Sequence, residues 1–253
     1  MRVTTRTVGD HGAPLTAYVL DTSEEMATAS VRPAVLILPG GGYFCTSDRE
    51  AEPVALAYIA EGFHAFVLRY STGEDVPYDR SYADGLAGLA WVRDHAAEYG
   101  VDPARIAVVG FSAGGHLDSA LGTLSEPKPA ALVLGYPVID AGMGAELGKA
   151  LPDTADAVTE AAPPTFLFTT ADDAVVPVAN SLRFAAALAA HGVPFELHVY
   201  RSGEHGLSLA KPLTANGHAG LVNSVVQGWF GESVRFLHEL WGDFPVAAGS
   251  PDA

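Results

Sequence analysis

The sequence has little of several residue types, and each shortage excludes a class of protein. Its 253 residues include one cysteine, Cys45, so an internal disulfide is impossible and Cys45 alone cannot form a zinc site. Charged residues make up only 17% of the chain, with 14 Lys plus Arg against 30 Asp plus Glu. The net charge of −16 repels phosphate backbones and anionic lipid surfaces. We therefore expect no nucleic-acid partner and no membrane partner.

Long apolar runs are also absent. Runs such as 185–190 and 130–134 are far shorter than the roughly 20 residues of a membrane span, and residues 1–6 lack the apolar core of a signal peptide. These features predict a cytoplasmic protein. Apolar residues still make up 49% of the chain, which is enough for a large core and excludes both intrinsic disorder and a coiled coil.

Short apolar strands alternate with helical segments along most of the chain. Residues 3–8 and 16–20, joined by a polar turn, predict an antiparallel hairpin. Further strands are expected at 34–38, 65–68, 105–110, 131–134, 165–169 and 195–200, and helices at 48–61, 82–99, 113–124, 178–191 and 221–240. Ser47 and Glu50 have the spacing of a capping box at the start of the first helix. The alternation predicts an α/β fold with a mostly parallel sheet and helices on both faces.

We expect a single domain over residues 1–253, because this length fits one large core. Residues 138–164 fit no strand or helix and are too many for an ordinary connection, so we interpret them as a small lid inserted in the fold. Residues 242–253 have the composition of a frayed tail.

The sequence Gly110-Phe111-Ser112-Ala113-Gly114 fits the Gly-x-Ser-x-Gly pattern. An apolar strand runs into this pattern and a helical sequence follows it, as a nucleophile elbow requires. In that turn the small neighbours allow the hydroxyl of Ser112 to project beyond the end of the strand. The alternative interpretation is a glycine-rich turn whose serine only caps the following helix.

A nucleophilic serine needs a base next to it. Of the nine histidines, His205 and His218 remain after those in predicted helices, in a strand, or ahead of the serine are set aside. His205 lies a few residues beyond the strand that ends at Tyr200, so it can reach over the edge of the sheet. We favour His205, and we expect His218 to be an exposed loop residue or a helix cap.

The base in turn needs an orienting acid. Asp172 and Asp173 follow the strand at 165–169, and one of them can face the base. The other is expected to cap the loop or face water, and Asp140 is a weaker rival. A negative oxygen in the reaction would need N–H donors, which Gly41 and Gly42 of the Gly40–Gly42 cluster and the N–H of Ala113 can supply. The glycine cluster could instead be a plain tight turn; it lacks the Gly-Lys-Ser/Thr ending of a phosphate loop.

Several motifs together resemble the bacterial α/β-hydrolases of the acetyl esterase, acetylxylan esterase and feruloyl-esterase-like group. They lie at 38–43, 102–115, 163–167, 172–177 and 204–207, and the resemblance covers about residues 32–241. It implies the α/β-hydrolase fold, with Asp173 as the acid of its Asp-x-x-Val-Pro pattern and Ser112 and His205 as the other members of the triad. Many relatives have His where this chain has Pro39, which affects the geometry of the glycine loop but not the mechanism.

The resemblance implies a serine carboxylesterase that acts on short acyl esters, with acetyl groups on small carbohydrates as the expected substrates and no cofactor or metal. A serine peptidase of the prolyl-oligopeptidase type and a non-catalytic binding protein on the same fold are the alternatives, and a homo-oligomer is possible. Because 38 residues precede Pro39, we expect an open cleft without a large N-terminal cap. Its rim is expected to include Tyr43, Phe44, Tyr136 and Trp229. Cys45 is expected to be a buried, inert thiol.

Overall fold

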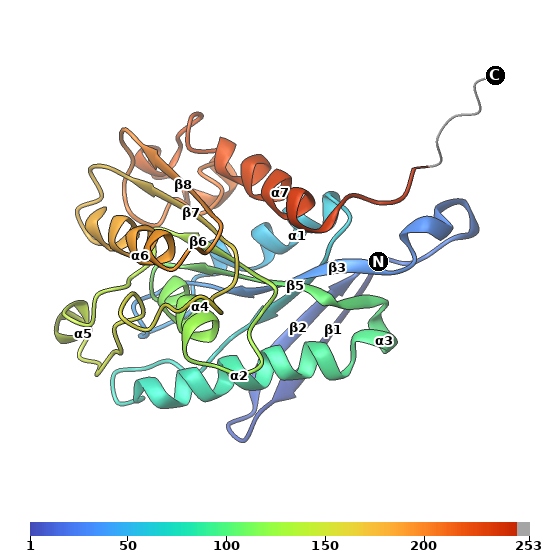
Figure 1. Cartoon of the computed structure of the whole chain (residues 1–253), viewed down its shortest axis with the longest axis horizontal. Coiled ribbons are helices and arrows are strands. Elements are labelled where there is room, and N and C mark those ends of the chain that lie inside the picture. The colour runs from blue at the N-terminus through green and yellow to red at the C-terminus, as the bar shows by residue number, and fades with distance from the viewer. Residues whose placement is uncertain (247–253) are drawn as a thin grey trace.

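The computed structural model describes residues 1–246, and an eight-stranded sheet lies at its centre (Figure 1). The strand order is β1-β2-β4-β3-β5-β6-β7-β8. The hairpin strands β1 and β2 are antiparallel, β2 is antiparallel to β4, and all other neighbours are parallel, which confirms the predicted sheet. The strands are β1 (Arg2–Val8), β2 (Ala13–Val19), β3 (Arg32–Leu38), β4 (His64–Leu68), β5 (Val101–Phe111), β6 (Ala131–Gly135), β7 (Thr165–Thr170) and β8 (Phe195–Tyr200).

Helices cover both faces of the sheet because consecutive strand residues point to opposite sides (Figure 1). On β5, Ile106 and Val108 pack toward α2 and α4, whereas Ala107 and Val109 pack toward α1 and α7. Helix α6 joins the α2 and α4 side through Phe184. The helices are α1 (Glu52–Ala60), α2 (Tyr78–Asp94), α3 (Ala96–Tyr99), α4 (Ala113–Thr123), α5 (Met143–Glu146), α6 (Ala179–Ala190) and α7 (Gly228–Trp241), with 3-10 turns η1 (Glu24–Ala29), η2 (Asp48–Glu50), η3 (Pro212–Thr214) and η4 (Ala219–Leu221).

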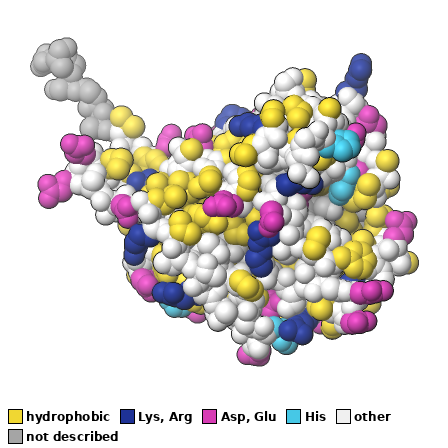
Figure 2. All heavy atoms as spheres, turned by 180° about the vertical axis from the view of Figure 1, so that it is seen from behind, with side chains coloured by type: hydrophobic (Ala, Val, Ile, Leu, Met, Phe, Trp, Pro, Cys, Tyr) yellow, Lys and Arg dark blue, Asp and Glu magenta, His cyan; other side chains and the backbone are white. Residues whose placement is uncertain are grey.

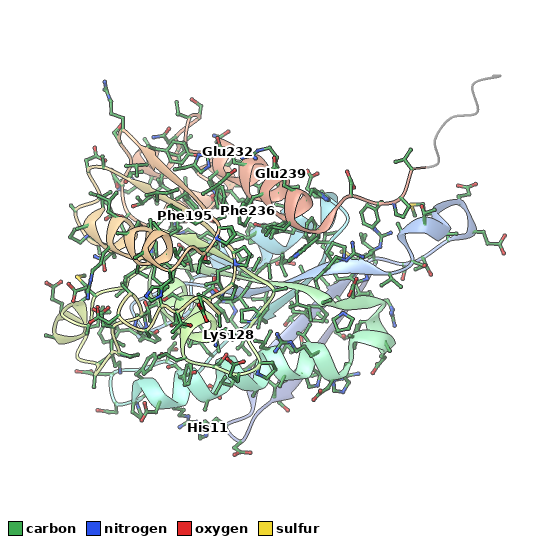
Figure 3. All side chains as sticks on the ribbon, viewed as in Figure 1. His11, Lys128, Phe195, Glu232, Phe236 and Glu239 are labelled. Atoms are coloured by element: carbon green, nitrogen blue, oxygen red, sulfur yellow. The ribbon has the colours of Figure 1, made fainter. Side chains whose placement is uncertain are left out.

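Helix α7 shows how the helical period sorts side chains between core and solvent. Phe236 projects toward the sheet and is buried, whereas Glu232 and Glu239 lie on the outer side of the helix (Figure 3). The outer carboxyl groups make local contacts: Glu232 accepts a hydrogen bond from the Tyr200 hydroxyl on β8, and Glu239 pairs with Arg235. The apolar face of α7 therefore closes this side of the core.

The last predicted helix starts later than expected. The last helix begins at Gly228 rather than at 221, because the Asn223 side chain accepts hydrogen bonds from the N–H groups of Val225 and Val226 and donates one to the Ser202 carbonyl. These bonds hold the segment as a turn against the loop after β8.

The sequence also predicts a frayed tail at residues 242–253. Residues 247–253 lie outside the described residues, and the ring of Phe244 lies 5.5 Å from the guanidinium of Arg32.

The predicted capping box at the first helix is wrong. The Ser47 side chain makes no capping hydrogen bond, and the chain forms the short turn η2 before α1 begins at Glu52. Glu50 is buried and accepts its hydrogen bonds from Gly40 and Tyr136 instead of from the helix start. Hydrogen bonds between Glu50 and residues distant in the sequence therefore replace the predicted local bond to the start of the helix.

The surface reflects the acidic composition. On the face seen in Figure 2, Asp and Glu side chains are scattered among apolar and uncharged ones, with separate Lys and Arg side chains between them. Over residues 1–246, the structure contains no helix that is both long and apolar enough to span a membrane.

One ionisable group is buried inside the core without a clear partner. Asp118 on α4 is fully buried, and within residues 1–246 neither carboxyl oxygen has a hydrogen-bond partner of normal geometry. Burial raises the pKa of Asp118 well above its ordinary value, and the nearby backbone of Gly110 and Val133 opposes this only in part. Asp118 therefore keeps its proton to a higher pH in the folded protein than in the unfolded chain.

We expect the Asp118→Asn variant to gain stability relative to the wild type as the pH rises. Because the pKa of Asp118 is higher in the folded protein than in the unfolded chain, the wild type is most stable below the unfolded-state pKa and loses stability as the pH rises toward the folded-state pKa. Asparagine does not ionise, so the variant does not lose stability in this way. The gain in the free energy of unfolding can reach about 1.4 kcal/mol per pH unit. Urea unfolding of both proteins at about pH 5 and about pH 8 measures it. A stability difference that does not change with pH would contradict the assignment.

Candidate active site

Ser112 lies in the turn between β5 and α4, with φ 53° and ψ −118°. This positive φ is strained for a serine and is imposed by the packing around it. A Cβ atom on Gly114 would lie 2.0 Å from the Leu38 carbonyl oxygen, and one on Gly110 would lie 2.3 Å from the Gly114 carbonyl oxygen. The two glycines of the sequence pattern are therefore required by close backbone approach, and the turn lifts Ser112 above the carboxyl edge of the sheet.

The structure brings Ser112, His205 and Asp173 together from three separate loops. The Ser112 Oγ lies 2.8 Å from Nε2 of His205, and the Nδ1 of that ring lies 2.7 Å from Oδ2 of Asp173. The Asp173 side chain is 1% exposed and that of His205 is 16% exposed, so the acid is shielded from solvent and the base is only partly exposed. This geometry orients Nε2 to accept the serine proton while Nδ1–H donates to the carboxylate.

Asp173 is held as a carboxylate. Its burial by itself raises the pKa, but the hydrogen bond and charge of His205 lower it, as do the N–H groups of Val175 and Val176, each 2.9 Å from Oδ1. The net result is a pKa below the ordinary value, so Asp173 is negative throughout the neutral range. A negative charge at this position can stabilise a protonated His205 ring.

The other candidates from the sequence lie away from the hydrogen-bonded series Ser112–His205–Asp173, called the relay below. Asp172 accepts a hydrogen bond from the Gly203 N–H and so caps the loop, one of the two roles expected for it. Asp140 accepts one from the Gly142 N–H. The His218 side chain is 60% exposed, as expected for a loop residue, and lies 3.7 Å from Glu204.

Gly41, Gly42 and Ala113 line the cavity in front of Ser112, and each has a backbone N–H group. Within residues 1–246, no carbonyl or side chain accepts a hydrogen bond from them. Gly41 has φ 135°, and its carbonyl accepts from the N–H groups of Phe44 and Cys45, which folds the glycine loop back on itself. These free donors can bind a negative oxygen that forms next to Ser112.

The cavity in front of Ser112 has a volume of about 360 Å³ and an apolar wall. Val175 and Val176 come from the loop that carries Asp173, and Val138, Met143 and Leu147 come from the segment 138–164 that the sequence analysis interprets as a lid. The Leu147 side chain lies 3.5 Å from the position that a Cβ on Gly42 would take. The apolar wall therefore comes close to the glycine loop.

Lys149 anchors that wall to the rest of the fold. Its side chain is buried, and Nζ donates hydrogen bonds to the carbonyls of Gly73, Glu74 and Val76 at 2.6 to 2.8 Å. All three ammonium donors are therefore satisfied by the loop that precedes α2. The segment 138–164 is thus tied down next to the cavity.

A second cavity lies on the other side of His205 and shares His205 and Val175 with the first. Its volume is about 570 Å³, and polar side chains line much of it. They are Asp172, Ser202, Glu204 and Asn223. His205 therefore lies between a cavity with an apolar wall and a more polar cavity.

The expected aromatic rim is wrong for two tyrosines. Tyr43 is 1% exposed, and its hydroxyl bonds to Nδ1 of His116 within the core. Tyr136 is 2% exposed, and its ring packs edge-on against His205 at 5.0 Å between ring centroids. Both rings turn inward because their hydroxyl groups find buried partners there, which outweighs exposure at the rim.

The remaining rim candidates differ among themselves. Trp229 is fully buried and stacks on Phe168, so its placement at the rim is also wrong. Phe44 is 50% exposed, as a rim residue would be, although it is not among the residues that line the cavity. Cys45 is exposed, contrary to the buried thiol that was expected, because the turn at Gly41 directs the chain outward at this point.

Sequence reasoning missed Arg49 and Glu50, which also line the cavity. Arg49 donates hydrogen bonds to the carbonyls of Gly206 and Thr214, at 2.7 Å and 3.0 Å. Both residues precede a helix, where charged side chains are ordinary, so the sequence alone offers no signal for their inward orientation.

Comparison with known proteins agrees with this architecture. The BD-FAE family model matches residues 20–132, and the prolyl oligopeptidase family model matches residues 149–218. The crystal structure of MGS-M1, an alpha/beta hydrolase enzyme from a Medee basin deep-sea metagenome library, is 41% identical, with a TM-score of 0.90 over 95% of this chain and 98% of that chain. The carboxylesterase Cest-2923 from Lactobacillus plantarum is 33% identical, with a TM-score of 0.88 over 94% and 98% of the two chains. The chain belongs to the α/β-hydrolase family, in its esterase branch.

Curated relatives give a narrower comparison. An acetylxylan esterase of Xylanibacter ruminicola is 31% identical over 198 residues, which are 68% of this chain and 40% of that protein. Endo-1,4-beta-xylanase B of Butyrivibrio fibrisolvens is 30% identical over 219 residues, which are 75% of this chain and 34% of that protein. The chain therefore spans about a third to two-fifths of the length of these relatives.

Proposed function

We propose that the protein is a serine carboxylesterase with Ser112 as nucleophile, His205 as base and Asp173 as the orienting acid. The continuous series of contacts from Ser112 Oγ through His205 to Asp173 carries this proposal, because an isolated serine hydroxyl is a poor nucleophile at neutral pH. Carboxylesterase names among the similar proteins support the same activity.

The proposed reaction uses the groups that face the cavity. Ser112 Oγ attacks the ester carbonyl carbon, and its proton moves to Nε2 of His205. The carbonyl oxygen becomes negative and accepts hydrogen bonds from the N–H groups of Gly41, Gly42 and Ala113. His205 then gives its proton to the alcohol oxygen, the carbon–oxygen bond breaks, and an acyl group remains on Ser112. Water, activated by His205 in the same way, releases the acid.

The two cavities suggest how the substrate lies. The alcohol oxygen must reach Nε2 of His205 to take its proton, so the alcohol part extends on the His205 side, where hydroxyl, amide and carboxyl side chains line the second cavity. We therefore propose a polyhydroxylated alcohol, such as a small carbohydrate, with a short acyl group over Gly42 and Leu147. The acetylxylan esterase relative supports the same substrate class.

We expect kcat/KM for p-nitrophenyl esters to fall from acetyl to butyryl and to be very low for octanoyl. The wall that includes Leu147 is tied down through Lys149, so an acyl methylene without room costs about 1 to 3 kcal/mol of overpacking instead of gaining burial energy. The series is measured at one pH and below the concentration at which the longer esters aggregate. A steady rise toward octanoyl would mean an open apolar groove and would exclude carbohydrate deacetylation as the main role.

Leu147→Ala provides the matched control for this series. The shorter side chain leaves the relay untouched but opens space next to Gly42, so the ratio of butyryl to acetyl kcat/KM should increase. An unchanged ratio would show that the acyl group lies elsewhere in the cavity.

The second candidate function is a serine peptidase, because the prolyl oligopeptidase family model matches residues 149–218. The same preparation assayed on acetylated sugars, feruloyl esters and aminoacyl amides separates the two activities. Amide hydrolysis faster than ester hydrolysis would favour the peptidase. If the well-folded protein cleaves neither, a non-catalytic binding role on this fold is the remaining explanation.

A further inference from the structure

Glu50 is a buried acidic residue that the proposed relay does not use. Its exposed fraction is 2%, and it lies on the short turn η2, where it forms part of the wall of the cavity in front of Ser112. Both of its carboxyl oxygens accept hydrogen bonds, one from the Gly40 N–H and one from the Tyr136 hydroxyl. A carboxylate suits two donors, and burial without them would be costly.

The first of these bonds fixes the glycine loop. The Gly40 N–H lies 2.8 Å from Oε2 of Glu50, and Gly40 directly precedes Gly41 and Gly42, which line the cavity. A Cβ on Gly40 would lie 2.8 Å from the same Oε2 and 3.0 Å from the Cβ of Ser112. Glu50 and Ser112 therefore flank the same glycine, and the orientation of its peptide group depends on Glu50.

The second bond reaches the loop that carries the base. The Tyr136 hydroxyl donates to Oε1 of Glu50 at 2.6 Å and accepts from the Ser208 N–H at 2.8 Å. Ser208 lies three residues beyond His205, and the Tyr136 ring packs against the His205 ring. Burial and the nearby Glu50 hold the pKa of Tyr136 well above its usual range, so its hydroxyl remains a donor.

We propose that Glu50 is a positioning residue that aligns the oxyanion donors with the base. One carboxyl group holds the loop of Gly41 and Gly42 through Gly40, and through Tyr136 it holds the loop of His205. The two loops are far apart in sequence, and Glu50 connects them within one network. Because the oxyanion contacts strengthen as negative charge develops, misalignment should lower kcat more than it changes KM. This inference rests on the proposed function.

The test compares Glu50→Leu, Glu50→Gln and the exposed neighbour Glu52→Gln. Leucine removes both acceptors, whereas glutamine keeps one oxygen that can still accept from the Gly40 N–H. We expect kcat for p-nitrophenyl acetate to fall about 100-fold in Glu50→Leu and about 10-fold in Glu50→Gln, with KM changed less than about 3-fold. Glu52→Gln, on the exposed start of α1, should match the wild type.

Thermal unfolding of each variant shows which of them fold. If Glu50→Leu does not fold, Glu50→Gln and Tyr136→Phe decide the matter: wild-type kcat in both would overturn the positioning role. A rise in KM with unchanged kcat would overturn it as well, because it would mark ordinary substrate binding.

Labelling with diethyl p-nitrophenyl phosphate separates this inference from the proposed function. In that reaction Ser112 Oγ displaces p-nitrophenolate and the protein gains a diethyl phosphoryl group, which mass spectrometry detects. A wild-type protein that is neither labelled nor active would reject the proposed function. A wild-type protein that is labelled and active, with Glu50 variants of equal kcat, would reject only the role of Glu50.

Discussion

Ser112→Ala should lower kcat for ester hydrolysis by about four powers of ten or more, with almost no change in thermal stability. Among the described residues, the hydroxyl group has one side chain as hydrogen-bond partner, Nε2 of His205 at 2.8 Å, and we propose it as the group that attacks the carbonyl carbon. Loss of a triad nucleophile removes the covalent route, and the remaining rate comes from binding and the oxyanion donors. Alanine tolerates the φ of 53° about as well as serine does, so the elbow should keep its shape.

Ser47→Ala is the matched control for this variant. Ser47 also lines the cavity but forms no hydrogen bond with His205 in the described part of the chain, so its loss should leave kcat near the wild-type value. Retention of more than about a hundredth of the wild-type kcat in Ser112→Ala would exclude this serine as the nucleophile.

Asp173→Asn should lower kcat by about three powers of ten or more, while Asp172→Asn should change it only a few-fold. The Asp173 carboxylate accepts the Nδ1–H of His205, whereas an amide can donate to Nδ1 and so stabilise the tautomer whose Nε2 carries the proton and cannot accept one from serine. Asp172 is next in the chain, but its carboxyl group bonds to the Gly203 N–H. The two variants therefore make the same chemical change at neighbouring positions, but only one of the two carboxyl groups contacts His205.

The comparison is made by measuring kcat and the midpoint of thermal unfolding for both variants. Equal losses of kcat in the two, accompanied by equal losses of stability, would mean that the loop as a whole and not the Asp173 carboxylate is responsible.

The sequence predicts the order of the elements, Ser112 and His205 because these depend on local patterns, whereas the choice of Asp173 over Asp172 rests on the family resemblance. Buried strands appear as continuous apolar runs, and Ser112 and Asp173 follow such strands, while His205 follows the half-buried strand β8; the carboxyl ends of these parallel strands meet at one edge. Of the glycines on either side of Ser112, Gly110 makes its close backbone contact with Gly114, whereas Gly114 makes its own with the distant Leu38 carbonyl. The short Gly-x-Ser-x-Gly pattern nevertheless marks the turn in the sequence.

The side chains around the site depend on contacts between distant segments, so local sequence patterns do not predict their orientation. Tyr43 and Tyr136 stand in loops without a hydrophobic period, so the sequence does not tell which way their rings turn. Their hydroxyl groups bond to residues 73 and 86 positions away. Glu50 looks like an ordinary helix-start residue for the same reason. Each of these side chains is oriented by a partner that only the folded chain brings near.

The exposed thiol of Cys45 has a practical consequence for inhibitor studies. Its sulfur lies 3.8 Å from the Gly41 carbonyl oxygen, next to the backbone that is proposed to bind the oxyanion. We expect alkylation of this thiol to add a bulky group beside the glycine loop and to disturb the loop. Inactivation by iodoacetamide or a maleimide would then imitate a cysteine hydrolase, even with Ser112 as the nucleophile. A Cys45→Ser protein that keeps its activity and resists these reagents distinguishes this disturbance from catalysis.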